Sequence, residues 1–418
     1  MGSHASRIAC GIRRRLPLCL AAWFSVCGVA VADREPPFSL VVGTQSIGTT
    51  YQLTDGPLLL EMAEAIAELG SDTLKISVTP NYTRHYRIER NPEYKSALDL
   101  ISKDPSYKAA FDMPFRNIML WLYPFSDTKS KFRTGNFRPG EAELIYREIY
   151  EFTEHLLKTY SNTGKSFFIG NWEGDWHTFS GRDRKEDPKP EILEGMREWF
   201  LLREKAVADA RRNTPHQGVN VYFYVEINLV ARAMREGRPA LVNQVLPHIK
   251  TDYVSYSAYD VSNVTTRIGG AEGRAMLFEA LDFIEKHLPP SDLPGKRVMI
   301  GEYGATYRPS RDAESQRRKA ADIMRWGLEW GCPFILYWQL YCNELVRAGD
   351  ANRGFWLIDN QGVKQPVWHL HHDFLQKANA FVDDYQRRNG RLPDQAAYLL
   401  AAQNWIELDA TAAPATRE

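Results

Sequence analysis

The chain alternates short β-rich runs with longer amphipathic segments, and the alternation repeats eight times after Phe38. The runs with strand composition are residues 39–45, 73–79, 115–124, 166–173, 219–228, 251–260, 297–304 and 333–341. The segments with helical periodicity are residues 58–69, 92–101 with 107–111, 141–160, 192–212, 239–249, 273–287, 313–330 and 367–388. Eight strand-then-helix units predict an α/β fold, a single (β/α)8 TIM barrel, in preference to two smaller domains.

The predicted barrel occupies residues 33–390, and residues 391–418 form a C-terminal helical extension and tail of small and polar residues. A chain of 418 residues is long enough for either one large barrel or two domains, so the alternation decides between them. The longest connections are residues 126–139, 177–190 and 342–362. All three follow predicted strands, so we expect extended loops on the C-terminal face of the barrel.

Residues 1–32 predict a signal peptide. Three arginines, residues 13–15, precede a short apolar run that ends in Ala30, Val31 and Ala32, the small-x-small pattern of a signal-peptidase site. We expect cleavage after Ala32 and a mature protein that is secreted or periplasmic. Because no later stretch approaches the roughly 20 apolar residues of a spanning helix, we expect no membrane segment in the mature form.

The charge balance argues against several classes of partner. Lysine plus arginine equals aspartate plus glutamate at 52 each, so no net field favours nucleic acid or an anionic membrane surface. A neutral substrate fits this balance better. The 11 tryptophans and 20 tyrosines are many for a core alone and would also supply flat platforms for sugar rings. We expect a monomer without a cofactor.

Two cysteines remain after the predicted signal peptide, Cys332 and Cys342, and they bracket one predicted strand. Ten residues of extended chain at about 3.3 Å each would hold the two sulfur atoms far beyond disulfide reach. We therefore expect two buried free thiols.

Polar and aromatic side chains gather at the C-terminal ends of the predicted strands. In a parallel barrel these ends meet on one face, where the active site lies. The candidates there are Thr44, Gln45, Ser77, Tyr82, Trp121, Tyr123, Asn171, Glu173, Glu226, Asn228, Tyr256, Tyr259, Glu302, Tyr303, Trp338 and Gln339.

Two of these strand ends carry a carboxylate directly after an apolar run. In residues 167–176, FFIGNWEGDW, side-chain alternation along a strand would put Asn171, Glu173 and Asp175 on one face. In residues 297–306, RVMIGEYGAT, the same alternation would align Glu302 with Val298 and Ile300. Two carboxylates at two strand ends indicate acid/base chemistry.

With the strands placed, the chain resembles the clan A glycoside hydrolases, retaining (β/α)8 enzymes that include cellulases, mannanases and xylosidases. IGEYGA at residues 300–305 is similar to the strand-seven motif of that clan, which implies that Glu302 is the nucleophile. GNWEGDW is similar to the strand-four motif, which implies that Glu173 is the acid/base. A tyrosine after strand six, Tyr256 or Tyr259, and the strand-eight Trp338 also match.

Three further features bear on this resemblance. Residues 354–368 resemble the hairpin that leads into the last helix of several clan families. Asn171 and Glu173 are separated by Trp172, where the clan generally has Asn and Glu adjacent. Lys75 stands at the strand-two position where the clan often has an arginine beside the nucleophile. No individual family is identified.

The resemblance implies that one carboxyl group donates a proton while the other attacks the anomeric carbon. Ionised Glu302 would raise the pKa of Glu173, and Lys75 with a tyrosine hydroxyl would keep Glu302 ionised. The expected reaction is cleavage of a β-linked polysaccharide, oligosaccharide or glycoconjugate.

Several residues keep a second interpretation. Asp175 is the alternative proton donor, and Glu226 either contacts sugar hydroxyls or forms an ion pair. Trp172, Trp176 and Trp338 are either sugar platforms or rim packing. The remaining predicted substrate-binding residues are Lys75, Tyr82, Trp121, Asn171, Asn228, Tyr256, Tyr259, Tyr303 and Gln339. Five loop arginines would serve an acidic glycan or remain solvated: Arg133, Arg182, Arg184, Arg347 and Arg353.

Two other functions compete with glycoside hydrolysis. The first is a barrel that binds glycans without cleaving them, suggested by the altered spacing of Asn171 and Glu173. The second is a metal-dependent barrel hydrolase, which would need a His-x-His pair near strand one, whereas residues 41–47 contain no histidine. In the cluster WHLHHD, residues 368–373, His369, His372 and Asp373 could share a helix face and bind a metal, but the cluster lies in the last predicted helix, away from the predicted catalytic face. No Gly-rich phosphate loop follows a strand, so nucleotide chemistry is unsupported.

Overall fold

The computed structural model describes residues 1–2, 36–127, 139–179, 185–307, 312–347, 349 and 351–406. The chain divides into Met1–Asp33 and Arg34–Glu418, and every strand lies in the second unit. The predicted signal peptide, the end of the C-terminal tail, and Arg133, Arg182 and Arg184 fall outside the described residues. Those predictions, and the domain bounds that depend on them, stay predictions.

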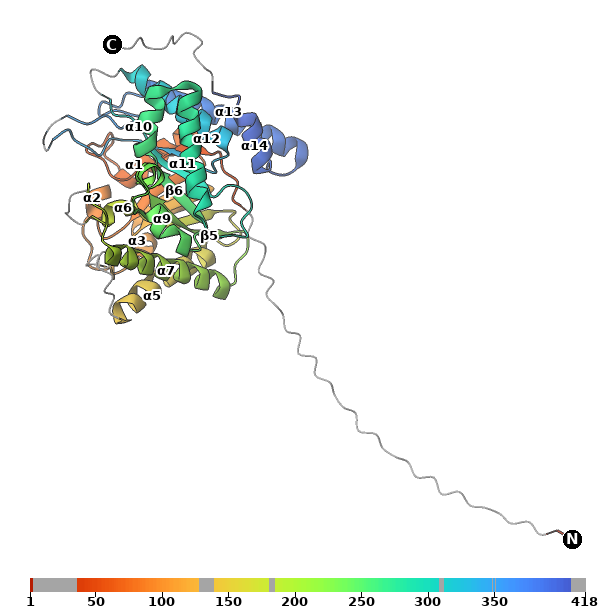
Figure 1. Cartoon of the computed structure of the whole chain (residues 1–418). Coiled ribbons are helices and arrows are strands. Elements are labelled where there is room, and N and C mark those ends of the chain that lie inside the picture. Colours follow the sequence, from red (N-terminus) through yellow and green to blue (C-terminus); the bar gives the residue numbers. More distant parts are fainter. Residues whose placement is uncertain are drawn as a thin grey trace. The chain divides into compact units, whose positions relative to one another are not determined.

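Eight parallel strands form one sheet, which confirms the predicted α/β barrel (Figure 1). The strands are β1 (Val42–Thr44), β2 (Thr73–Val78), β3 (Asn117–Leu122), β4 (Ser166–Gly170), β5 (Asn220–Ile227), β6 (Tyr253–Ser257), β7 (Val298–Tyr303) and β8 (Ile335–Tyr337). Each strand pairs with its sequence neighbour, and β8 returns to β1. A bridge between Gln45 and Lys75 joins β1 to β2 and completes the circle.

Helices surround the strands, and every predicted helical segment contains helix. The larger ones are α1 (Leu58–Leu69), α3 (Ala97–Lys103), α4 (Pro105–Asp112), α5 (Pro139–Thr159), α7 (Pro190–Asn213), α11 (Gly270–Lys286), α12 (Ala313–Trp330), α13 (Pro366–Asn389) and α14 (Gln395–Ala402). The shorter ones are α2 (Tyr82–Tyr86), α6 (Gly174–His177), α8 (Val230–Glu236), α9 (Leu241–Gln244), the 3-10 turn Leu246–His248 and α10 (Tyr259–Ile268). Of these, α2, α6, α8 and α10 were not predicted.

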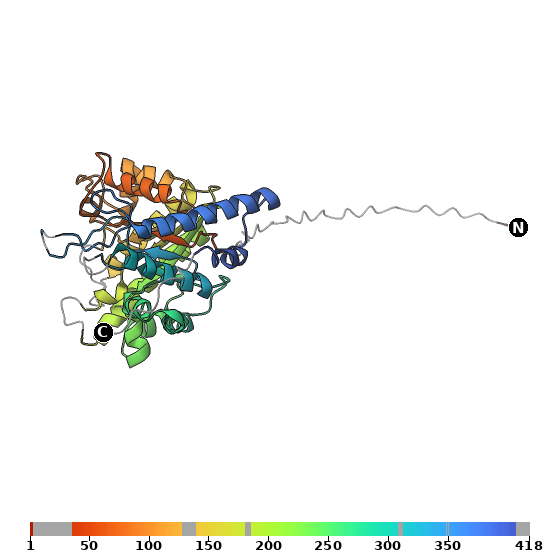
Figure 2. The same cartoon turned by 90° about the horizontal axis from the view of Figure 1, so that it is seen from above.

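Local chemistry explains the helix ends that the sequence predicts well. Gly70 and Gly331 follow α1 and α12 with φ of 94° and 90°, a conformation that favours glycine and stops each helix where predicted. Figure 2 shows α13 as one long helix followed by α14, which lies after Gly390. No helix among the described residues is both long and apolar enough to cross a bilayer.

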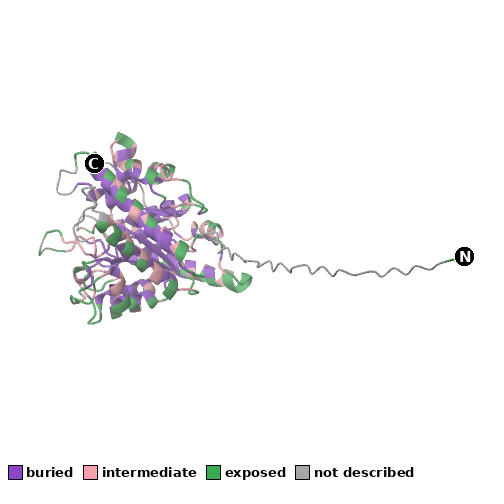
Figure 3. Cartoon of the chain, turned by 90° about the horizontal axis from the view of Figure 1, so that it is seen from below, coloured by how far each residue is buried: buried purple, intermediate pink, exposed green. Residues whose placement is uncertain are grey.

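The side chains of the strands alternate between two apolar layers. Val, Ile and Leu side chains such as Leu74, Leu120 and Val225 pack between the sheet and the helices. Aromatic side chains fill the barrel interior, where Phe168 packs against Tyr222, Tyr253 and Phe334 with ring centroids 5.1–5.5 Å apart. Figure 3 shows the strands as a buried band through this unit.

Both cysteines are buried and free, as predicted. The predicted hairpin before the last helix is also present, because Ile358 pairs with Lys364 just before α13 begins.

Candidate active site

A buried ion pair forms the base of the candidate site. Lys75 of β2 donates from Nζ to Glu226 Oε2 of β5 at 2.8 Å, and the two side chains are 1 % and 0 % exposed. Ser255 of β6 donates to the same Glu226 oxygen at 2.7 Å. The other oxygen, Oε1, accepts from the backbone N–H of Glu173 at 3.0 Å. Glu226 is therefore fully engaged, which resolves its two interpretations in favour of the ion pair.

A bulge in β7 turns Glu302 toward the same space. Tyr256 pairs with Ile300, but the next residue of β6, Ser257, pairs with Glu302, so Gly301 is an extra residue in β7. Val298 and Ile300 face the helices. The prediction that Glu302 shares their face is therefore wrong, because the bulge reverses the alternation.

Gly301 is needed at the bulge because its surroundings leave no room for a side chain. A Cβ atom there would lie 1.7 Å from Ser255 Oγ. The Gly301 carbonyl accepts from Lys75 Nζ and from Gln45 Nε2, both at 3.1 Å. Lys75 thus connects Glu226 to the bulge and is not bonded to Glu302, which corrects the expectation that it pairs with the predicted nucleophile.

Glu173 and Glu302 meet at one hydroxyl group. Ser257 Oγ lies 2.6 Å from Glu173 Oε1 and 3.3 Å from Glu302 Oε2. Those two carboxyl oxygens are therefore no farther apart than the sum of the two contacts, 5.9 Å. The second oxygen of Glu173 accepts from the indole N–H of Trp176 at 3.0 Å. Glu302 Oε1 is buried and has no hydrogen-bond partner among the described residues.

The surroundings raise the pKa of both carboxyl groups. Burial, with a smaller effect of the Glu226 charge, raises the pKa of Glu173 to about 7, against the opposing hydrogen bonds from Ser257 and Trp176. Burial first, then the charges of Glu226 and Glu173, raise the pKa of Glu302 well above its usual value, and Lys75 partly opposes this. The surroundings thus favour the protonated form of both carboxyl groups.

Aromatic side chains follow several of the strands, and the centroid of the Trp121 ring lies 5.2 Å from Lys75 Nζ. The rings of Trp121 and Trp338 stack with centroids 5.7 Å apart, and Trp172 lies 6.3 Å from Trp121. Tyr259, the first residue of α10, has a buried hydroxyl without a partner in the described part of the chain. Burial and the nearby charges of Glu302 and Glu173 raise its pKa well above the usual value. Of the two tyrosines predicted after strand six, Tyr259 is the one beside the carboxyl groups.

Trp338 and Gln339 follow β8 and hold neighbouring loops. The Trp338 indole N–H donates to Glu344 Oε1 at 3.2 Å, and Glu344 also pairs with Arg353. Gln339 is fully buried, and its Oε1 accepts from the backbone N–H of Ile47 at 3.0 Å. Gln339 therefore supports the loop after β1, and its predicted contact with substrate is not supported. Arg347 is exposed on the same loop as Arg353.

The strand predicted over 166–173 ends at Gly170, so its side chains do not continue to alternate. The Asn171 amide is bonded to main-chain groups: Oδ1 accepts from Glu226 N at 2.9 Å, and Nδ2 donates to Glu226 O at 3.1 Å. Asp175 is buried and accepts from the backbone N–H groups of Asn228, Leu229 and Leu241 at 2.8–3.2 Å. The predicted common face of Asn171, Glu173 and Asp175 is therefore absent.

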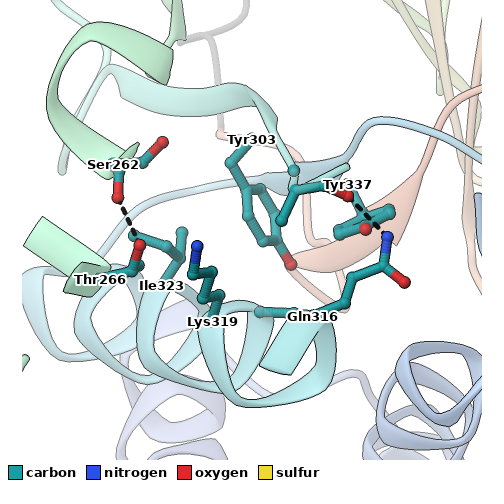
Figure 4. A pocket seen from close by; sticks show the side chains of 10 residues that line it. Ser262, Thr266, Tyr303, Gln316, Lys319, Ile323 and Tyr337 are labelled. Atoms are coloured by element: carbon teal, nitrogen blue, oxygen red, sulfur yellow. Dashed lines mark hydrogen bonds between the residues drawn. The ribbon is translucent and has the colours of Figure 1, made fainter. Parts of the chain in front are cut away.

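Tyr256, Tyr303 and Tyr82 lie away from the carboxyl pair. Tyr256 packs between the sheet and the helices and donates to Asp260. The Tyr303 hydroxyl lies 3.1 Å from His371 Nε2 of α13. Figure 4 shows Tyr303 beside a small cavity bordered by α10 and α12, outside the barrel interior. These outward positions follow from strand alternation, which the sequence prediction did not apply to them.

Tyr82 and Asn228 occupy loop positions with other contacts. Tyr82 is buried in α2, where its hydroxyl accepts from Asn91 N at 3.1 Å and its ring packs against Phe125 and Tyr94, so it supports a loop and does not face the pair. The side-chain amide of Asn228 is buried without a partner among the described residues. Substrate binding by Asn228 stays a prediction.

Two residues of the site, Ser255 and Ser257, were not predicted from the sequence. Their signal is in TDYVSYSAYD, residues 251–260, where positions 253, 255 and 257 share one face of a strand. Two small hydroxyl side chains at successive inward positions near a strand end leave space for groups from neighbouring strands.

The histidines of residues 368–373 have structural contacts. His371 is fully buried and its Nδ1 donates to the Val367 carbonyl oxygen at 2.7 Å, while His372 stacks on Trp368. Within the described ranges, no group of three or more His, Cys, Asp or Glu side chains is arranged to hold a metal ion.

Comparisons with known proteins place this geometry in a fold family. No protein-family model matches the chain, and no curated protein matches it. Among solved structures, a GH5_18 protein from Streptomyces cattleya in complex with Manβ1-4GlcNAc has a TM-score of 0.54 at 13% identity, covering 82% of this chain and 81% of that one. The exo-β-1,4-mannosidase Op5Man5 from Opitutaceae bacterium strain TAV5 has a TM-score of 0.52 at 14% identity, covering 82% of this chain and 60% of that one.

The chain has the barrel fold of the clan A glycoside hydrolases. At this level of identity the likeness concerns the fold, and no individual family is identified. In (β/α)8 barrels generally the site lies at the C-terminal strand ends, which is where Glu173 and Glu302 meet here.

Proposed function

We propose that this protein is an exported retaining glycoside hydrolase that cleaves a β-linked polysaccharide, oligosaccharide or glycoconjugate by double displacement. Glu302 is the nucleophile and Glu173 is the acid/base. The observation that carries the proposal is the shared contact with Ser257, which limits the two carboxyl oxygens to a separation of 5.9 Å. Retaining enzymes hold their carboxyl groups about 5–5.5 Å apart, whereas inverting enzymes need roughly 6.5–9.5 Å to admit a water molecule.

The reaction proceeds in two steps. In the first, a Glu302 oxygen bonds to the anomeric carbon as the glycosidic C–O bond breaks, and Glu173 gives its proton to the leaving oxygen. In the second, ionised Glu173 takes a proton from water, whose oxygen bonds to the anomeric carbon and releases Glu302. The net change is the addition of one water molecule across the glycosidic bond.

The contacts of the two carboxyl groups support this division of roles. Glu173 lies in a buried setting that raises its pKa to about 7, which favours the protonated form that a donor needs below that pH. Burial raises the pKa of Glu302 as well, so the assignment of the two roles rests on their contacts. Asp175 is a poor alternative donor because backbone N–H groups already occupy both of its oxygens. Glu302 Oε1 has no hydrogen-bond partner in the described part of the chain, so it is available to attack a substrate carbon.

Replacement of the nucleophile tests the proposal directly. Glu302→Ala should abolish turnover of an aryl β-glycoside, and added sodium azide should restore aglycone release with formation of a glycosyl azide of inverted configuration. Full activity of Glu302→Ala without azide would contradict the proposal. The first panel should include β-mannosides, because two of the similar solved structures bear names of that chemistry.

Replacement of the acid/base gives a complementary result. Glu173→Ala should hydrolyse glycosides with poor leaving groups very slowly but should still react with 2,4-dinitrophenyl glycosides, which leave without protonation. Asp175→Asn is the matched comparison, and it should lower stability without this dependence on the leaving group.

The second candidate function is glycan binding without cleavage. One observation favours it, because the Asn171 amide is bonded to the main chain of Glu226 and is not directed at a substrate hydroxyl. A panel of glycans that bind the wild-type protein without release of reducing ends would support this alternative.

Export is part of the main proposal, and N-terminal sequencing of exported protein should find Asp33 as the first residue.

A further inference from the structure

The Ser257 hydroxyl occupies the point where the two candidate catalytic carboxyl groups meet. Ser257 is the last residue of β6 and is fully buried. Its register opposite Glu302 is set by the bulge at Gly301. Its Oγ is thus held by paired strands, 2.6 Å from Glu173 Oε1 and 3.3 Å from Glu302 Oε2.

A hydroxyl group has one hydrogen atom, so it can donate to only one of two carboxyl groups at a time. If both were ionised, one carboxylate oxygen would face a lone pair of Ser257. If one is protonated, that group donates to Ser257 and Ser257 donates to the other. The position of Ser257 therefore matches a pair that holds a single proton.

The contacts of Glu173 place its proton. Glu173 Oε2 accepts from the Trp176 indole N–H, so the oxygen that faces Ser257, Oε1, is the one free to carry a proton. On the other side, Glu302 Oε2 faces Ser257 and Oε1 has no partner in the part of the chain that the structure describes. In a hydrogen-bonded chain, protonated Glu173 Oε1 donates to Ser257 Oγ, and Ser257 Oγ donates to Glu302 Oε2. Each donor in this chain then faces an acceptor.

We propose that Ser257 is a positioning residue that links Glu173 and Glu302 in one hydrogen-bonded chain and relays a single proton between them. This inference rests on the proposed function. In the relay, the proton on Glu302 Oε2 passes to Ser257 Oγ while the hydrogen of Ser257 passes to Glu173 Oε1. One O–H bond breaks and one forms at each transfer, and the net charge of the site does not change.

The relay produces the state that the reaction needs, with Glu173 protonated and Glu302 ionised. When the leaving oxygen of a substrate takes the hydrogen bond from Glu173, Ser257 is left donating to Glu302. Substrate binding thus selects one position of the shared proton without any transfer to solvent.

Other ionisable groups around the pair set the background charge. They are Lys75 from β2, Tyr224 and Glu226 from β5, Tyr259 from α10 and, next to Tyr259, Glu344 from the loop after β8. Lys75 and Glu226 neutralise each other in a buried pair. A hydrogen bond donated by Ser257 lowers the pKa of the carboxyl group that receives it, because it stabilises the ionised form. In the chain Glu302 receives this hydrogen bond, whereas Glu173 donates to Ser257, which stabilises the protonated form of Glu173.

The experiment compares Ser257→Ala and Ser257→Thr with the wild type by the pH dependence of kcat/KM. Loss of the hydroxyl should lower kcat/KM by roughly 10- to 100-fold and narrow the pH profile, with the acid limb moving to higher pH and the alkaline limb to lower pH, because the singly protonated pair loses its stabilisation. Threonine keeps the hydroxyl and should restore both limbs. Ser262→Ala is the matched control, because it removes a buried hydroxyl of α10 that has no partner among the described residues, and it should change neither limb.

A second readout needs no substrate. Infrared absorption of protonated carboxyl groups, assigned with Glu173→Gln and Glu302→Gln, should show the two ionisations of the pair moving closer together in Ser257→Ala, the first to higher pH and the second to lower pH. A loss of activity in which neither the limbs nor this titration move would overturn the inference and leave the proposed function intact. If the wild-type protein cleaves no glycan while Ser257→Ala still shifts the titration, the proposed hydrolase function would be rejected and the shared proton would be retained. If Ser257→Ala does not fold, Ser257→Cys, a weaker donor of similar size, should show an intermediate shift.

Discussion

The interaction of Lys75 with Glu226 is the most buried charge pair at the base of the site. Both side chains are excluded from solvent, and the carboxylate also accepts from Ser255 and from the backbone of Glu173. Removing one member of such a pair leaves an uncompensated buried charge, which typically costs about 3–5 kcal/mol of stability. The pair therefore fixes both the interior of the barrel and the backbone that carries the acid/base.

We predict that Lys75→Met lowers the free energy of unfolding by about 3–5 kcal/mol. The double variant Lys75→Met with Glu226→Gln should recover much of that loss, because the carboxylate charge is removed together with its partner. Urea unfolding of the two single variants, the double variant and the wild type completes the double-mutant cycle. Purely additive effects would show that the two side chains do not interact in solution.

Glu173 also determines a predicted pH dependence of activity. Its pKa is raised to about 7, so its proton is lost as the pH rises through about 7, and kcat/KM on substrates with poor leaving groups should fall there. The same measurement on 2,4-dinitrophenyl glycosides should show a weaker alkaline fall in the first step, since that leaving group needs no proton. An alkaline limb that is identical for the two substrate types would contradict the role of Glu173 as the acid.

In strand β7 a bulge places a site residue directly after an apolar run. The bulge at Gly301 lets Val298 and Ile300 pack against helices while Glu302 enters the barrel. This change of face was not predictable from alternation, because a bulge depends on pairing with β6 and on the space beside Ser255. The ends of helices such as α1 and α12 were predictable, since a glycine follows each helix directly in the sequence.

We predict that Gly301→Ala destabilises the protein and reduces activity by at least about 100-fold. The new Cβ would lie 1.7 Å from Ser255 Oγ and 2.9 Å from its Cβ, so β6 or β7 must shift, and displacements of about 1 Å at a site can cost that much activity. The double variant Gly301→Ala with Ser255→Gly relieves the contact and should be more stable than the Gly301→Ala single variant. Equal stability of those two proteins in urea unfolding would refute the steric explanation.

At the scale of the whole molecule, the barrel was predictable because each strand and helix carries its own periodicity, and the candidate carboxyl pair followed from the strand order. The partners of individual polar groups were not predictable. The Lys75 side chain bonds to Glu226 and not to Glu302, and the Asp175 carboxylate bonds to backbone N–H groups and not to the residues of the candidate site. Such choices depend on distances across the barrel between residues that are far apart in the sequence, for which local patterns carry no signal.

The carboxyl groups of the site should also lower the stability of the whole fold at neutral pH. Glu173 has a pKa of about 7 in the folded protein against an ordinary value of 4.5, so the folded state binds its proton more tightly than the unfolded state. The contribution of this group to stability is therefore present at low pH and is lost as the pH rises from about 4.5 to about 7. Glutamine has no proton to lose, so Glu173→Gln should be more stable than the wild type at pH 8 by roughly 1–3 kcal/mol. The difference should shrink toward pH 4.5, and urea unfolding across this range measures it, with exposed Glu89→Gln as the control. A difference that is the same at every pH would mean that Glu173 is ionised to the same extent in the folded and unfolded chains, and the elevated pKa on which its role as proton donor depends would then be absent.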